Sequence, residues 1–186
     1  MGQQFVITVE KLRAKDVESL RLIVIHCIQN LEHPKLREAA MATLRNAQQC
    51  YIERSIASGE FTPMFRVMGY NVRWTELSAT DRRRVLWTIL NEDLPPINSE
   101  AYMRKWGTPQ TIERLRAIWR ELQTYMRSYG HNDRKEIAVA RWSKDMRFLE
   151  RVAQNLNESG RVSLDDIERL AAEVPDEELL IAPVVE

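Results

Sequence analysis

The chain has 186 residues, of which 44% are hydrophobic and only six are glycine, so the composition excludes general disorder and is compatible with a folded core. The net charge is zero, but residues 1–60 carry 8 basic and 7 acidic side chains, residues 61–151 carry 17 and 11, and residues 152–186 carry 2 and 9. Charge that is sorted in this way bears on partners and on contacts within the chain, not on catalytic chemistry.

The first sixty residues predict one short strand followed by two helices. Residues 5–9 are β-prone, and from Asp16 onwards apolar residues recur every three or four positions, which is typical of a helix. The repeat consists of Val17, Leu20, Val24, Cys27 and Leu31. Pro34 suits the first turn of a second helix, and Gly59 suits its left-handed C-terminal cap. The short connection predicts that the two helices pack antiparallel.

The two cysteines indicate a reducing compartment. Cys27 and Cys50 lie in helical patterns on largely apolar faces, which favours buried free thiols over a disulfide or a zinc site. The first ten residues lack the pattern of a secretory signal, and the longest apolar stretch, residues 22–28, is too short to span a bilayer. We therefore expect a cytoplasmic protein that is not associated with a membrane.

Residues 61–77 form the least helical part of the chain. Pro63, Gly69 and Asn71 interrupt a run of apolar and aromatic residues. Two interpretations remain open at this point: a short β element near residues 64–74 that pairs with residues 4–9, or an irregular aromatic loop.

The strongest pattern predicts a long antiparallel helical hairpin at about residues 109–129 and 133–157. A capping-box-like start at Ser78 and Asp81 precedes it and predicts a further helix that ends before Pro95. Each segment of the hairpin repeats apolar residues at intervals of three and four. The two stripes are Ile112, Leu115, Trp119, Leu122, Met126 and Tyr129, then Val139, Trp142, Met146, Leu149, Ala153 and Leu156. The predicted fold class is therefore mainly α, a helical bundle.

The C-terminal part, residues 158–186, predicts an acidic helix and tail. Ser163 and Asp166 suit the start of this helix, Pro175 ends it, and an acidic and then apolar stretch follows. The domain prediction has three segments, residues 1–60, 61–157 and 158–186, which can also pack as one domain.

The sequence contains no recognisable catalytic motif. His26, His33 and His131 have no metal-ligand spacing, no Gly-rich phosphate loop is present, and no Gly-x-Ser-x-Gly occurs. We assign no catalytic residue, no metal ligand and no cofactor, and the balance is against an enzyme.

Basic residues are the main candidates for an anion or nucleic-acid contact. Arg82, Arg83 and Arg84 open a helix, where cations oppose the helix dipole. Ion pairs with acids elsewhere in the chain, or a bound anion, would compensate for this unfavourable placement. The full candidate set is Arg82, Arg83, Arg84, Arg104, Lys105, Arg134 and Lys135. Interspersed acids favour the other interpretation, a solvated face with internal ion pairs.

Two function hypotheses follow. The first is a non-enzymatic helical protein–protein interaction module, a subunit or accessory factor of a larger assembly that binds another protein or a second copy of itself. Its candidate partner contacts are Trp74, Trp106, Leu179, Leu180 and Ile181. The alternative is a nucleic-acid-associated protein that binds phosphates through the basic middle region, with the acidic tail competing for that surface.

Overall fold

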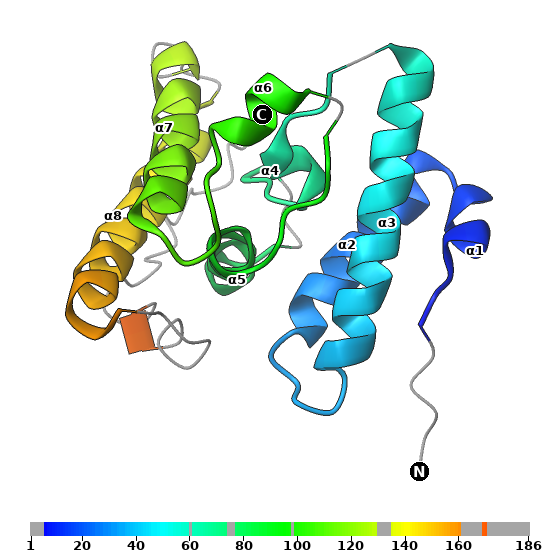
Figure 1. The fold of residues 1–186 in the computed structure, drawn as a ribbon, viewed down its shortest axis with the longest axis horizontal. Helices are drawn as coiled ribbons and strands as arrows, with labels where there is room; N and C mark the ends of the chain where they lie inside the picture. Colours follow the sequence, from blue (N-terminus) through cyan, green and yellow to red (C-terminus); the bar gives the residue numbers. More distant parts are fainter. Residues whose placement is uncertain are drawn as a thin grey trace, which may run out of the picture.

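The computed structural model describes residues 6–59, 61–73, 77–97, 99–129, 135–160 and 169–170. Within these residues the chain forms eight helices and no strand (Figure 1), which confirms the prediction of a mainly α bundle. They are α1 (Val9–Arg13), α2 (Val17–Asn30), α3 (Arg37–Ser58), α4 (Met64–Val67), α5 (Ala79–Asn91), α6 (Glu100–Arg104), α7 (Ile112–Tyr129) and α8 (Glu136–Ser159). Over the same part of the chain, no helix combines the length and the apolar character that crossing a membrane requires.

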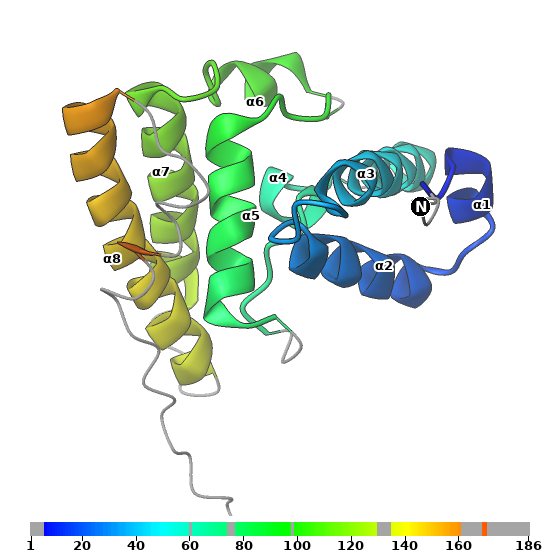
Figure 2. The same cartoon turned by 90° about the horizontal axis from the view of Figure 1, so that it is seen from below.

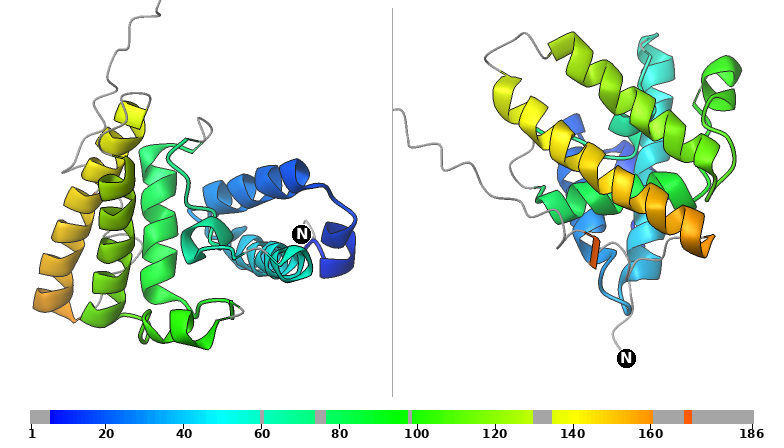
Figure 3. Two further views of the ribbon diagram at one scale, coloured as in Figure 1. Left: turned by 90° about the horizontal axis from the view of Figure 1, so that it is seen from above. Right: turned by 90° about the vertical axis from the view of Figure 1, so that its left-hand side faces the viewer.

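The helices are arranged in two layers. In Figure 2, α5, α7 and α8 lie side by side, and the α2–α3 pair lies crosswise beside α5. The view from the opposite side in Figure 3 shows the same arrangement, with α1 on the outer side of the pair. The short helix α4 lies between the layers. Buried apolar side chains from both layers belong to one hydrophobic cluster.

Local sequence signals place several helix ends as predicted. Asp16 accepts a hydrogen bond from the backbone of Ser19 at the start of α2, and Gly59 ends α3 with a φ of 69°. The capping box at the start of α5 is complete, because Ser78 and Asp81 bond each other's backbone N–H groups.

The predicted hairpin is present as α7 and α8, which pack against each other. Helix α7 begins at Ile112, three residues later than predicted, because residues 107–111 form a turn in which Gln110 has a φ of 58°. In α7 the most deeply buried residues are Ile118 and Leu122, whereas Trp119 is only partly buried at the edge of the core.

The proposed β element was wrong for the described residues. The backbone of Ile7 bonds side chains of α3, not a neighbouring strand: its N–H donates to Thr43 Oγ1 at 3.1 Å, and its carbonyl accepts from Asn46 Nδ2 at 2.8 Å. Residues 64–67 form α4, closed by a bond of 2.8 Å from the Tyr70 N–H to the Phe65 carbonyl. Residues 1–5 and 74–76 lie outside the described part of the chain.

A buried arginine joins the start of α7 to the ends of α5 and α6. Arg114 donates through Nε to the Trp106 carbonyl at 2.7 Å and through Nη2 to the Gly107 carbonyl at 2.8 Å. Its Nη1 donates to the carbonyls of Ile89 at 2.7 Å and Glu92 at 3.2 Å. These carbonyls lie at or just beyond helix C-termini, where backbone acceptors lack partners within the helix.

We expect Arg114→Met to lower the free energy of unfolding by about 2–3 kcal/mol, because it leaves several buried carbonyls without a donor. Arg116→Met is the matched control, since Arg116 is exposed on the same helix. Urea unfolding followed by circular dichroism measures both variants. Equal losses would contradict the assigned role of Arg114.

Candidate functional site

The three arginines at the start of α5 lie inside the fold. Arg82, Arg83 and Arg84 are only 1%, 2% and 5% exposed. Arg84 pairs with Asp81 of its own helix at 3.0 Å and with Glu32, which follows α2. Of the two interpretations left open by the sequence, the structure shows pairing with acids of the same chain. None of the three guanidinium groups is placed to contact an external anion on an open surface.

Arg82 and Arg83 both lie within salt-bridge distance of Asp145 of α8, and this carboxylate is fully buried. Arg82 Nε donates to Asp145 Oδ2 at 3.0 Å, and Arg83 Nε lies 4.0 Å from Oδ1. The Tyr70 hydroxyl also donates to Oδ2, at 2.7 Å. Burial raises the pKa of the Asp145 carboxyl, and the positive charge of Arg82 opposes this shift. The cluster joins α5, α8 and the segment after α4, so its position indicates a structural role.

The other sequence candidates are distributed over the surface and the core. Lys105 pairs with Glu121 at 3.1 Å, and the exposed Arg104 lies 3.9 Å from the exposed Glu100. Trp106 is 1% exposed, so it packs in the core and does not present its ring to a partner. Five further candidates lie outside the described residues: Trp74, Arg134, Leu179, Leu180 and Ile181.

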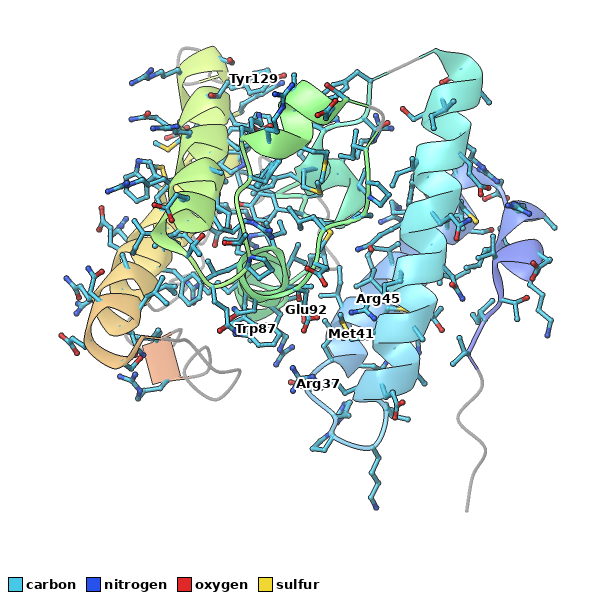
Figure 4. All side chains as sticks on the ribbon, viewed as in Figure 1. Arg37, Met41, Arg45, Trp87, Glu92 and Tyr129 are labelled. Atoms are coloured by element: carbon cyan, nitrogen blue, oxygen red, sulfur yellow. The ribbon has the colours of Figure 1, made fainter. Side chains whose placement is uncertain are left out.

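Two side-chain contacts link α3 to α5 and to the residue that follows it. The Arg37 guanidinium lies 5.2 Å from the centre of the Trp87 ring, and Arg45 pairs with Glu92 at 3.3 Å. Figure 4 labels these four residues, together with Met41, on the facing sides of the two helices. Each of these cations already has a partner across the contact, which makes this region an internal junction.

An open groove of about 410 Å³ lies where α2, α3 and the segment around α4 meet the α7–α8 hairpin. The chain has five Trp, five Tyr and four Phe, and six of these aromatic residues line the groove. They are Tyr51, Phe65, Tyr70, Tyr125, Tyr129 and Trp142. A pocket of this size is in the range that holds small ligands or part of a larger one.

Three arginines, Arg21, Arg66 and Arg73, line the same groove. Arg21 pairs with Glu18 on its own helix. Arg66 and Arg73 are exposed, and neither forms a salt bridge with a carboxylate of the described residues. None of the described residues that line the groove is Asp, Glu, His or Cys. We call this surface the arginine–aromatic groove; its lining is positively charged.

The hairpin side of the groove is an aromatic stack. Trp142 stacks on Tyr125 and on Tyr129, with ring centres 5.7 and 5.9 Å apart. Lys135, one of the sequence candidates, lies 3.6 Å from the centre of the Tyr129 ring. Tyr129 is labelled in Figure 4 at the end of α7. These contacts hold the rings in place before a ligand arrives, which lowers the entropic cost of binding.

The phenols of the groove are hydrogen-bond donors at neutral pH. Burial raises the pKa of Tyr51 and of Tyr125 above the ordinary value for tyrosine. A tyrosine phenol is protonated at neutral pH even at its ordinary pKa, and the upward shift acts in the same direction. A protonated phenol donates to a phosphate or carboxylate oxygen. Arginines and neutral phenols together favour an anionic ligand.

The groove and the thiols offer little for bond-breaking chemistry. Burial raises the pKa of the Cys27 thiol to about 11, which keeps it protonated and weakly nucleophilic at neutral pH. No group of three or more His, Cys, Asp or Glu residues suited to a metal ion occurs in the described part of the chain. The arrangement is suited to binding.

Sequence reasoning missed most of the groove. Arg66, Arg73 and Tyr51 were not among the candidates, and Tyr125 and Tyr129 were not recognised as binding residues. The available signal was residues 65–73, where Arg66 and Arg73 lie near Phe65 and Tyr70 in a segment that fits neither a helix nor a strand period. The residues from α3, α7 and α8 join them only through the tertiary fold.

Comparison of the chain with protein-family models, with curated proteins and with solved structures gives no match.

Proposed function

We propose that this chain is a non-enzymatic helical interaction module that binds an anionic partner in the arginine–aromatic groove. The observation that carries the proposal is the lining of the groove, which combines three arginines and six aromatic residues without a described carboxylate. Arginine, tyrosine and tryptophan are the residues that contribute most often to binding energy at interfaces.

The groove replaces the start of α5 as the proposed binding surface. Arg82, Arg83 and Arg84 are buried and lie close to carboxylates of the same chain. Arg66 and Arg73, in contrast, are exposed at the groove. Positive charge without nearby acids attracts an anionic partner and selects against a cationic one. The proposal therefore rests on different residues from those that the sequence suggested.

Two kinds of partner fit this chemistry. An acidic segment of another protein, or of a second copy, would make the chain a subunit or accessory factor of a larger assembly. A nucleic acid would supply phosphates, and the basic, aromatic lining favours this second candidate specifically. In that case, removal of residues 175–186 is expected to tighten binding, because an acidic tail competes with phosphates for arginines.

The test is a charge reversal in the groove. Fluorescence anisotropy of the full chain at low salt measures binding to two labelled polyanions, polyglutamate and a short oligodeoxythymidine. We expect Arg66→Glu with Arg73→Glu to weaken the binding of at least one probe by about tenfold or more, since each charge-assisted contact contributes on the order of 1 kcal/mol.

The matched control is Arg116→Glu with Arg120→Glu, which makes the same change in net charge on an exposed face of α7. It is expected to have a much smaller effect. Equal losses in the two double variants would show diffuse attraction to the whole surface and would exclude the groove. If neither probe binds the unmodified chain, the proposed function is wrong.

A further inference from the structure

We infer that the ligand of the arginine–aromatic groove is a single-stranded nucleic acid, with bases against the aromatic rings and phosphates at Arg66 and Arg73. This inference rests on the proposed function and specifies its partner. Three observations support it: the apolar lining of the groove is mainly aromatic, Tyr51 is not covered by another ring, and the groove is open to solvent.

The apolar part of the groove is aromatic more than aliphatic. Val17, Pro63 and Val72 are the aliphatic members of the described lining, against six aromatic residues. Peptides that bind as strands need a free sheet edge, and peptide helices need a continuous apolar groove for their anchor residues. Aromatic-lined grooves also bind proline-rich peptides, but a proline-rich segment supplies no anion for Arg66 and Arg73. The described residues contain no strand. Aromatic rings, in contrast, stack with any base, because every base has a flat π face.

Tyr51 is the ring best placed to stack on a base. It is partly buried and packs against the hydrophobic core, and among the described residues it contacts neither another aromatic ring nor a cation over its ring. Tyr129 is already covered by Trp142 and Lys135, and Tyr125 lies against Trp142 and Phe65. We therefore assign base stacking to Tyr51 and the support of the groove wall to the rings of the hairpin.

Phosphate recognition falls to the arginines of the segment around α4. A guanidinium group matches phosphate with two parallel hydrogen bonds, and it is always charged. Arg66 and Arg73 are exposed on one short segment, and Arg21 of α2, which pairs with Glu18, is the third arginine of the lining. Arg141, which donates to the Val72 carbonyl at 2.6 Å, fixes the end of this segment against α8.

The shape favours a single strand over a duplex or a free nucleotide. The groove is partly open to solvent, so a nucleotide bound in it can continue into a longer strand outside, whereas an enclosed pocket suits a ligand that ends there. In a duplex the base faces are stacked on one another and cannot reach an aromatic ring of the protein. A single strand exposes both its bases and its phosphates.

The experiment compares five labelled or competing probes on the full chain: oligodeoxythymidine, oligouridine, a duplex of the same length, thymidine monophosphate and polyglutamate. We expect the single strands to bind most tightly. We expect Tyr51→Ala to weaken the single strands by about tenfold, since one base stacked on an aromatic ring contributes about 1–3 kcal/mol. Polyglutamate has no ring to stack and can lose at most one hydrogen bond from the phenol, so its binding should change much less. Tyr51→Phe, which keeps the ring, should restore strand binding.

A second measurement reports the phosphate contacts directly. The slope of log K against log salt should become less steep by about 1.4 in Arg66→Ala with Arg73→Ala, because each phosphate contact on a single strand contributes about 0.7. This change would not follow from a structural defect alone.

Each outcome separates the inference from the proposed function. If polyglutamate binds more tightly than the strands and Tyr51→Ala changes nothing, the ligand is an acidic protein segment: the inference falls and the proposed function stands. Equal binding of the duplex, or of thymidine monophosphate, overturns the assignment to a single strand. If no probe binds, both proposals fail.

Discussion

Asp145→Ala is expected to lower the free energy of unfolding by about 3–5 kcal/mol, because it removes the buried carboxylate that pairs with Arg82 and lies 4.0 Å from Arg83. Asp145 is the only described carboxylate within salt-bridge distance of Arg82 and Arg83. It also accepts the hydroxyl of Tyr70, so the substitution removes a contact from each of three parts of the fold. A loss of this size is a large fraction of the stability of a typical domain.

Chemical unfolding followed by tryptophan fluorescence measures the effect. Asp145→Asn is the conservative control: it keeps the size and one acceptor oxygen, and we expect it to cost less than Asp145→Ala. The double variant Asp145→Ala with Arg82→Met removes both partners of the ion pair, so the loss should be smaller than the sum of the two single losses. Additive losses would show that the carboxylate and Arg82 do not stabilise each other. If Asp145→Ala does not fold, Asp145→Asn and the Arg82 variant still provide the comparison.

Local chemistry made much of the helical architecture predictable. The hairpin follows from apolar residues at intervals of three and four, and the start of α5 follows from Ser78 and Asp81. Both signals act over a few residues, so they can be recognised without knowledge of the fold.

The sequence could not predict in the same way whether the arginines of α5 form ion pairs inside the fold or an exposed anion site. Three cations at a helix N-terminus are unfavourable by themselves, and this conflict is visible in the sequence. The sequence does not show how this conflict is relieved, because the carboxylate that pairs with Arg82 is 63 residues away along the chain, on α8. Only the packing of α5 against α8 decides between an internal ion pair and an exposed anion site.

The two short segments for which β structure was one interpretation illustrate a related limit. β-branched residues near the N-terminus favour a strand, but the side chains of Thr43 and Asn46 satisfy the backbone of Ile7. For segments of this length, tertiary contacts outweigh intrinsic preference. The groove is a further case, because α2, α3, α7 and α8 each contribute to it.

The second large effect concerns Gly69, at the turn between Arg66 and Arg73. Its φ is 84°, a conformation that glycine adopts without strain, and a Cβ atom there would lie 2.5 Å from Val24 Cγ1 and 2.9 Å from Ile28 Cδ1. We expect Gly69→Ala to lower the free energy of unfolding by about 3 kcal/mol, from backbone strain of about 1–2 kcal/mol and overpacking of about 1–3 kcal/mol.

Gly59→Ala separates these two causes. Gly59 has a similar φ of 69°, but no atom lies within 4 Å of the position that its Cβ would take. Only backbone strain applies there, so we expect a loss of about 1 kcal/mol, measured by the same urea titration. If both alanine variants lose the same stability, the close contact with α2 contributes nothing.

Because Gly69 sets the path of the chain between Arg66 and Arg73, Gly69→Ala should also weaken oligodeoxythymidine binding by the molecules that remain folded, whereas Gly59→Ala should not.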